Sequence, residues 1–139
     1  MPIMQVHLQT SAYSQEQVHH FLERASQVYA EVLESPIERV RIFIHDYPAE
    51  FIAVGGKVTS DSGVLAPFFE AFLMEGRPLS QQHAVLERIT DVLVECFEAD
   101  RSLIRGVCNM VSPERWGIAG KPAAAARAAE LAARENLNR

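Results

Sequence analysis

The stretch PFFEAFLMEGR, residues 67–77, repeats the pattern of PIMQVHL, residues 2–8, and this repetition decides the fold. Each stretch opens with a proline, which has no amide hydrogen and is tolerated at the first position of a strand. In residues 2–8, apolar residues at every second position alternate with polar ones, which is the pattern of a β-strand. Each stretch is therefore predicted to be the opening strand of one half of the chain.

A long amphipathic helix is predicted after each opening strand. Ser14 and Gln17 form the pattern of a capping box, and apolar residues between 18 and 33 recur at three- and four-residue steps. In the second half, Ser80 is the predicted helix cap, and the apolar residues of 85–97 form the buried face. The two halves therefore share their second element as well.

A second strand is predicted after each helix, at residues 39–45 and at residues 103–111. A strand, a long helix and another strand make a β-α-β unit, whose two strands run parallel. The same offset relates three landmarks of the two halves. Pro67 follows Pro2, Trp116 follows Phe51 and Gly120 follows Gly55, each by 65 positions.

These features predict an α+β fold made of two fused β-α-β repeats with pseudo-twofold internal symmetry, the product of a gene duplication. The four strands should form one mixed sheet with both helices on one face. The repeats span residues 2–57 and 67–121, with a linker at 58–66 and a helical tail at 122–139, and the whole is predicted to be a single domain. The tail either covers an interface or only adds solubility.

Composition excludes several classes of protein. The net charge of −5 argues against nucleic acid as a partner, because phosphate binding needs a basic face. No apolar run is long enough to span a membrane, and no signal peptide is visible, so a cytoplasmic protein is predicted. The histidines are scattered and are expected at the surface or the edge of the core: His7, His19, His20, His45 and His83.

The amino-terminal proline is the candidate chemical group. Methionine before proline is usually removed, which would free the secondary amine of Pro2. An α-amino group titrates near ~7.7–8.0 when unperturbed, and nearby cations or partial burial lower that pKa. A neutral amine near physiological pH is an effective general base. Pro2 is therefore predicted to act as a base once Met1 is removed.

Six short motifs stand in a specific order and spacing: residues 2–8, Arg41 and residues 51–56 in the first half, and residues 67–77, Arg105 and residues 116–120 in the second. Together they resemble 4-oxalocrotonate tautomerase, a family that uses an amino-terminal proline as its base. The chain as a whole looks like a fused member of the tautomerase superfamily, which implies a tautomerase-like fold.

The resemblance implies one working site in each chain. In the short family members, a site combines the proline of one subunit with the turn arginine of its dimer partner, so Pro2 should meet Arg77 from the other half. Arg105, or alternatively Arg41, would be the second arginine and would come from a neighbouring chain. The residues implied for substrate binding are Trp116, which would form the apolar wall, Arg41 and Phe51.

The opposite cleft is predicted to be inactive. The nitrogen of Pro67 is locked in a peptide bond and has no basicity, and the first half lacks the Glu-Gly-Arg turn. Ala12 or Tyr13 stands where the arginine of that turn would be. This cleft would therefore have lost both its base and its arginine.

A base with two guanidinium groups suits a small anionic 2-oxo acid or its enol, because arginine holds a carboxylate in a bidentate fork. The resemblance implies an enol–keto tautomerase that acts on 2-hydroxymuconate-like or phenylenolpyruvate-like acids, as in aromatic degradation. No metal or organic cofactor is needed. Three chains would form a homotrimer, a pseudo-hexamer of β-α-β units.

Two other functions stay open at this point. One is another reaction on the same scaffold, either cis-3-haloacrylate dehalogenation with hydration or malonate semialdehyde decarboxylation. The dehalogenases have an additional arginine where Met74 stands, and the decarboxylases place an aspartate after the first helix that this chain does not obviously supply. The other is a non-enzymatic trimeric binding protein, against which the Arg77 turn argues.

Overall fold

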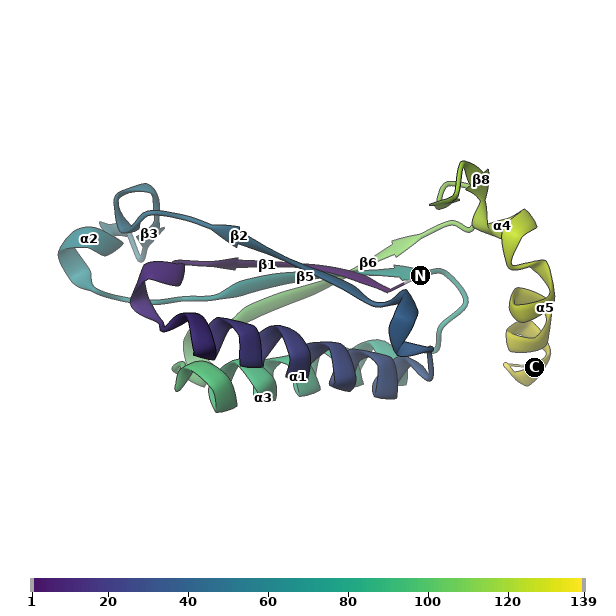
Figure 1. Cartoon of the computed structure of the whole chain (residues 1–139), viewed down its shortest axis with the longest axis horizontal. Helices are drawn as coiled ribbons and strands as arrows, with labels where there is room; N and C mark the ends of the chain where they lie inside the picture. Colours follow the sequence, from purple (N-terminus) through teal and green to yellow (C-terminus); the bar gives the residue numbers. More distant parts are fainter. Residues whose placement is uncertain (1, 139) are drawn as a thin grey trace.

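The computed structural model describes residues 2–138 and places four strands in one sheet with two long helices on one face (Figure 1). Met1, whose removal is predicted above, and Arg139 lie outside the described residues. The strands of the sheet are β1 (Ile3–Leu8), β2 (Arg41–Asp46), β5 (Phe68–Met74) and β6 (Arg105–Val111), and the long helices are α1 (Gln15–Leu33) and α3 (Leu79–Phe97).

The strand order is β2-β1-β5-β6. The two opening strands, β1 and β5, are antiparallel at the centre of the sheet, and each pairs in parallel with the second strand of its own half. Gln5 lies opposite Glu70, and Ile3 lies opposite Phe72, so the start of β1 is beside the end of β5. The predicted α+β fold, with a mixed sheet of two β-α-β repeats, is confirmed.

The two long helices begin differently. Ser14 caps α1 in a capping box with Gln17, as predicted: the Ser14 hydroxyl accepts a hydrogen bond from the Gln17 amide, and the Gln17 side chain accepts one from the Ser14 amide. The prediction that Ser80 caps α3 is wrong, because Pro78, two residues earlier, is at the cap position and the helix begins at Leu79. Proline already holds the fixed φ that leads into a helix.

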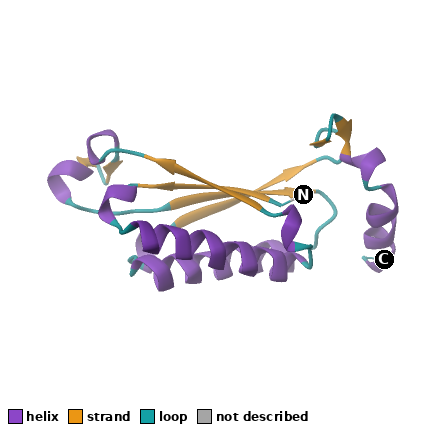
Figure 2. Ribbon diagram, viewed as in Figure 1, coloured by secondary structure: helices purple, strands orange, loops and turns teal. Residues whose placement is uncertain are grey.

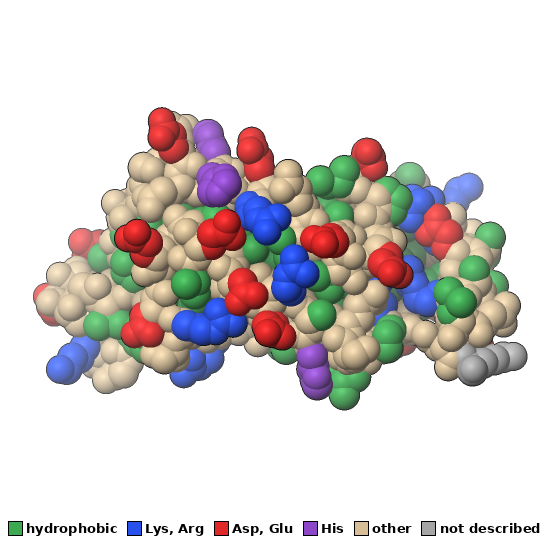
Figure 3. All heavy atoms as spheres, turned by 90° about the horizontal axis from the view of Figure 1, so that it is seen from below, with side chains coloured by type: hydrophobic (Ala, Val, Ile, Leu, Met, Phe, Trp, Pro, Cys, Tyr) green, Lys and Arg blue, Asp and Glu red, His purple; other side chains and the backbone are tan. Residues whose placement is uncertain are grey.

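The core lies between the sheet and the two helices. Alternate residues of the two central strands point toward the helices and are almost completely buried, as the strand pattern predicts. Aromatic residues from both helices fill the space, with Phe21 and Tyr29 fully buried. Figure 3 shows the opposite, outward face of the helices, where acidic and basic side chains are interspersed.

Short elements extend from both ends of the sheet (Figure 1). Both predicted second strands start later than expected, because 3-10 turns occupy their first residues. The segment expected to be a linker contains α2. One end of the sheet carries β3 (Ala53–Val54), β4 (Lys57–Val58) and α2 (Thr59–Ser62). The other end carries β7 (Gly117–Ile118), β8 (Lys121–Pro122), α4 (Ala123–Ala126) and α5 (Ala128–Leu137). The 3-10 turns are Thr10–Ala12, Ile37–Arg39, Ala49–Phe51 and Arg101–Leu103.

The second face of the sheet carries no helix (Figure 2). Large apolar side chains are exposed on it: Phe43 is 51% exposed, and Phe68 and Val107 are each 37% exposed. An exposed apolar sheet face of this kind marks an interaction surface. None of the helices within residues 2–138 has the length and apolar character that crossing a membrane would require.

Candidate functional site

Pro2 lies at the end of the sheet where β1 begins. The residue is buried, and its carbonyl oxygen accepts a hydrogen bond of 3.1 Å from the Arg41 amide. Because β1 and β5 are antiparallel, this end of the sheet also carries the end of β5 and the turn that follows it. That turn contains Arg77, so the register of two central strands brings the predicted base and the predicted arginine to the same end of the molecule.

The Arg77 guanidinium is held under the carboxyl end of α1. Its Nη1 donates to the carbonyl oxygen of Leu33 at 2.8 Å and to Oε1 of Gln81 at 2.9 Å. Burial, and then the nearby positive charge of Arg134, lower the pKa of Arg77 to about 10, which still leaves it charged at neutral pH. Arg77 therefore has a structural partner in addition to any ligand that it binds.

A cleft of about 520 Å³ opens beside Arg77, between the end of α1 and the C-terminal helix α5. Helix α5 is tied to this place by a bidentate ion pair, in which Arg39 donates to both carboxylate oxygens of Glu130 at 2.7 Å. Nη1 of Arg134 is buried there without a hydrogen-bond partner. The ionisable residues that line the cleft are mostly basic: Arg39, Arg77, Arg127 and Arg134, against Glu34 and Glu130.

Trp116 lies at this same end of the sheet. It is 8% exposed and packs with Met74 and Ala123 in a small second core, against which Ile3 from the start of β1 is also packed. One face of the tryptophan borders a shallow hollow of about 340 Å³ on the helix-free side of the sheet, together with Ile3 and Phe72. An apolar wall therefore stands near the start of the strand that Pro2 opens.

Two of the predicted site residues lie at the other end of the chain's own sheet. Arg105 is opposite Phe68 at the start of β5, and its Nη1 donates to the carbonyl oxygens of Ser102 and Ile104 at 2.8 and 3.0 Å. Phe51 is 79% exposed in the turn after β2. Neither residue can line the Pro2 end of its own chain.

Arg41 lies at the Pro2 end, directly opposite Ile3 on the neighbouring strand, and is exposed. The structure thus places Pro2, Arg77, Trp116 and Arg41 at one end of the sheet, with Arg77 and Trp116 in separate hollows, and places Arg105 and Phe51 at the other end.

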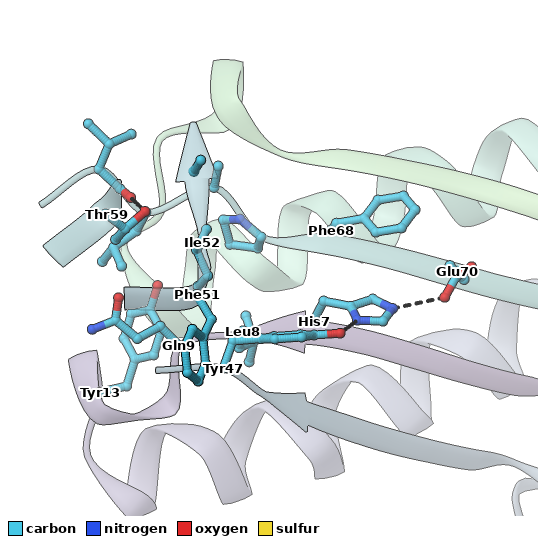
Figure 4. Close-up of a pocket in the computed structure, with 15 residues that line it drawn as sticks. His7, Leu8, Gln9, Tyr13, Tyr47, Phe51, Ile52, Thr59, Phe68 and Glu70 are labelled. Carbon is cyan, nitrogen blue, oxygen red and sulfur yellow. Dashed lines mark hydrogen bonds and ion pairs between the residues drawn. The ribbon is translucent and has the colours of Figure 1, made fainter. Parts of the chain in front are cut away.

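A cluster that the sequence did not predict occupies the opposite cleft, which has a volume of about 540 Å³ (Figure 4). His7 is at its centre: its Nδ1 lies 2.7 Å from the Tyr47 hydroxyl, and its Nε2 lies 2.8 Å from Oε2 of Glu70. The imidazole also stacks on His45 and Phe68, with ring centroids 4.8 and 5.4 Å away. His7 is half-buried, which agrees with the expected position at the edge of the core, but its hydrogen bonds to Tyr47 and Glu70 were not predicted.

The signal that could have predicted the His7 cluster was the register of the sheet, that is, which residue of β1 lies opposite which residue of β5. Once β1 and β5 are aligned about Gln5 and Glu70, His7 must lie opposite Phe68 and diagonal to Glu70, on the helix-free face. The repeat in the sequence predicts both strands, but it does not say which residue of one faces which residue of the other.

Comparison with known proteins agrees with this architecture. The family described as tautomerase enzyme matches residues 2–62 and again residues 67–126, so the chain belongs to the tautomerase family and carries two copies of its unit. The 2-hydroxymuconate tautomerase of Comamonas testosteroni is 41% identical over 54 residues, which is 39% of this chain and 86% of that protein. The 2-hydroxymuconate tautomerase of Pseudomonas putida is 39% identical over the same length.

Several solved structures share the whole arrangement. The W0 fused 4-OT, a symmetric trimer, is 29% identical with a TM-score of 0.81 and covers 88% of this chain and 98% of its own. The F6 fused 4-OT, an asymmetric trimer, has a TM-score of 0.82 at 23% identity, covering 89% and 98%. N1, of the cis-3-chloroacrylic acid dehalogenase family, has a TM-score of 0.76 at 16% identity and covers 98% of both chains. The resemblance to a fused, duplicated tautomerase is confirmed.

Proposed function

We propose that this chain is a cofactor-independent enol–keto tautomerase that uses the amino-terminal amine of Pro2 as its general base on a small anionic 2-oxo acid. The observation that supports the proposal is that the strand opened by Pro2, from the first half, begins at the end of the sheet where β5 leads into the Arg77 turn, from the second half. Membership of the tautomerase family and the two 2-hydroxymuconate tautomerase relatives support it.

The proposal requires a neutral amine at Pro2. Pro2 lies at the same end of the sheet as the basic residues beside Arg77. Nearby positive charge and partial burial are the two effects that would lower the pKa of an α-amino group from its usual value of about 8. The free amine is then available as a base at neutral pH, which is the state that proton abstraction requires.

The proposed reaction moves one proton. Pro2 takes the proton from the 2-hydroxy group of the enol, the O–H electrons form the C2 carbonyl, and the carbon–carbon double bonds shift along the chain. The protonated amine then returns the proton to a carbon atom, which gives the conjugated ketone and restores the base. Atoms and charges balance without a metal, an organic cofactor or an external oxidant.

Arg77 and its cleft are proposed to hold the substrate's carboxylate. A guanidinium matches a carboxylate with two parallel hydrogen bonds, which fix position as well as charge. Arg134 adds a buried, unpartnered Nη1 in the same cleft. Trp116 would exclude water from the apolar side of the site and so strengthen these charged contacts.

Arg105 can take part only if a second copy of the chain brings it to the site. It lies at the far end of its own sheet, on the helix-free face that also exposes Phe43, Phe68 and Val107. Packing these faces together in a homotrimer would bury the apolar surface and carry the Arg105 of one chain toward the Pro2 of another. Arg41, which is already beside Pro2, is the alternative second arginine.

Light scattering on the purified protein tests the assembly. A homotrimer predicts a scattering mass of three times that of one chain at micromolar concentration. The helix-free face supplies the driving force, so Phe43→Glu should reduce the mass, while Glu23→Gln on the charged outer face of α1 should leave it unchanged. A monodisperse monomer of the parent protein would reject the trimer.

A spectrophotometric substrate screen tests the reaction class. Conversion of 2-hydroxymuconate or phenylenolpyruvate to its ketone, above the uncatalysed rate, is the expected result. The same preparation should not release halide from cis-3-haloacrylates, because Met74 stands where the dehalogenases have an additional arginine. It should not release carbon dioxide from malonate semialdehyde, because no aspartate follows the first helix where the decarboxylases place one. Faster turnover of either alternative substrate than of both enols would assign the scaffold to that reaction instead.

A further inference from the structure

Helix α5 is fastened to the rest of the chain at three places. Its Glu130 forms the bidentate ion pair with Arg39. Leu131 packs against the small second core, and Nδ2 of Asn138, just beyond the helix, donates to the Gly76 carbonyl at 2.6 Å. Figure 1 shows α5 beyond one end of the sheet, apart from both long helices. A few contacts therefore decide whether the helix is docked.

The helix depends on this docking for its own stability. It has 10 residues, and none of these described residues is buried. An isolated helix shorter than about 12–15 residues is marginal in water, because propagation over so few residues does not offset the cost of nucleation. Release of α5 from the Arg77 cleft is therefore expected to unfold it.

The docked helix brings like charges together. Arg134, on α5, lines the same cleft as Arg77, and its positive charge contributes to the lowered pKa of that guanidinium. Of the two acidic residues that line the cleft, Glu130 is already paired with Arg39, so Glu34 alone remains to offset the pair. Repulsion between Arg77 and Arg134 thus opposes docking while the cleft is empty.

An anion in the cleft would reverse this balance. Negative charge placed between the two guanidinium groups stabilises the docked arrangement and has no such effect on the undocked one, so binding favours docking. The coupling is reciprocal, so docking of α5 raises the affinity for the anion by the same factor. The cleft, at about 520 Å³, is within the size range of small-molecule sites.

We propose that α5 is a strap that closes over the Arg77 cleft when a small dicarboxylate occupies it, with one negative charge for Arg77 and one for Arg134. Because the two guanidinium groups belong to different elements, two separate carboxylates match them better than the single centre of a phosphate. The inference rests on the proposed function for its link to turnover, since it names a dicarboxylate as the substrate class, but the closure itself can be measured without any reaction.

Hydrogen exchange of the assembled protein, followed by mass spectrometry of peptides that cover residues 128–138, measures the closure. The probes are adipate, a saturated dicarboxylate that has no enol to convert, hexanoate, which has the same chain length and one carboxylate, and inorganic phosphate, all at matched ionic strength. Saturating adipate should slow exchange in α5 by about fivefold or more, the lower end of usual couplings between two sites. Hexanoate and phosphate should slow it by less than about twofold.

Two variants separate the strap from simple binding at Arg77. Arg134→Gln removes the charge that α5 supplies, so adipate should lose its advantage over hexanoate both in affinity and in protection of α5. Leu131→Ala weakens docking without changing any charge, and Leu131 does not line the cleft. By the reciprocal coupling it should speed exchange of α5 in the free protein and lower the affinity for adipate, measured by calorimetry, by about fivefold.

The matched control is Arg88→Gln, which removes one positive charge from the surface of α3 and should alter neither readout. The strap is overturned if adipate leaves exchange of α5 unchanged, if hexanoate or phosphate protects it equally well, or if Arg134→Gln keeps the preference for adipate. Protection by adipate in a protein that converts no enol would uphold the strap and reject the tautomerase. Turnover without any protection would do the opposite.

Discussion

Replacing Pro2 with alanine should lower kcat by about 100-fold, within the 10²–10⁴ range typical of a general base. Alanine also permits removal of Met1, so a primary amine remains, but the secondary amine and its rigid ring are lost. Pro2 precedes β1 and donates no hydrogen bond to the sheet, so the fold should be retained. Steady-state kinetics on the best substrate of the screen, with circular dichroism on the same samples, measures both effects.

The same substitution at the equivalent position of the second half is the control. Pro67→Ala changes a nitrogen that is already part of a peptide bond, so kcat should stay within about twofold of the parent. Full activity of the Pro2→Ala variant would show that Pro2 is not the general base. Equal losses in the two variants would show that the effect comes from the strand ends and not from the amine.

Replacing Arg77 with alanine should lower kcat/KM by about 10- to 150-fold, the equivalent of the roughly 1.5–3 kcal/mol that a charged hydrogen bond to a carboxylate contributes. A larger loss is expected if the guanidinium also positions the substrate for proton transfer. The matched control is Arg88→Ala on α3, which removes the same charge from a long, exposed contact of 3.4 Å with Glu31 and should change little.

The structural role of Arg77 must be separated from its proposed role in binding. Loss of its bond to the Leu33 carbonyl will loosen the end of α1, so the melting temperature of the variant is measured alongside its kinetics. Arg77→Gln, which can still donate one hydrogen bond to that carbonyl, should recover stability but not kcat/KM. Recovery of activity together with stability would make Arg77 a structural residue only.

The architecture could be predicted from the sequence because repetition and periodicity are local signals. Two proline-opened strands at a constant offset predict two β-α-β units, and the alternation within residues 2–8 predicts the buried face of β1. The start of α3 was misplaced by two residues because proline and serine both occur at the beginning of helices, and only the backbone shows which one does.

The site was only partly predictable, because it depends on contacts between distant segments. The pairing of β1 with β5 places Pro2 and Arg77 at one end, as the family resemblance implies, but it also places Arg105 and Phe51 at the other. Arg39 and Glu130, whose ion pair docks α5, are 91 positions apart in the sequence. The hydrogen bonds of His7 reach Tyr47, 40 positions away, and Glu70, 63 positions away. No local periodicity of the sequence encodes contacts over such separations.

The most direct test of the central claim is covalent labelling of the active protein with a 3-halopropiolate, followed by intact mass and peptide mapping. The electrophile should react with the one free secondary amine, so the account predicts a single adduct per chain, on Pro2 of a chain that begins without Met1. Pro67 should stay unlabelled, and activity should fall in proportion to the adduct. Inactivation by an adduct on any other residue, or full activity in chains that retain Met1, would contradict the account.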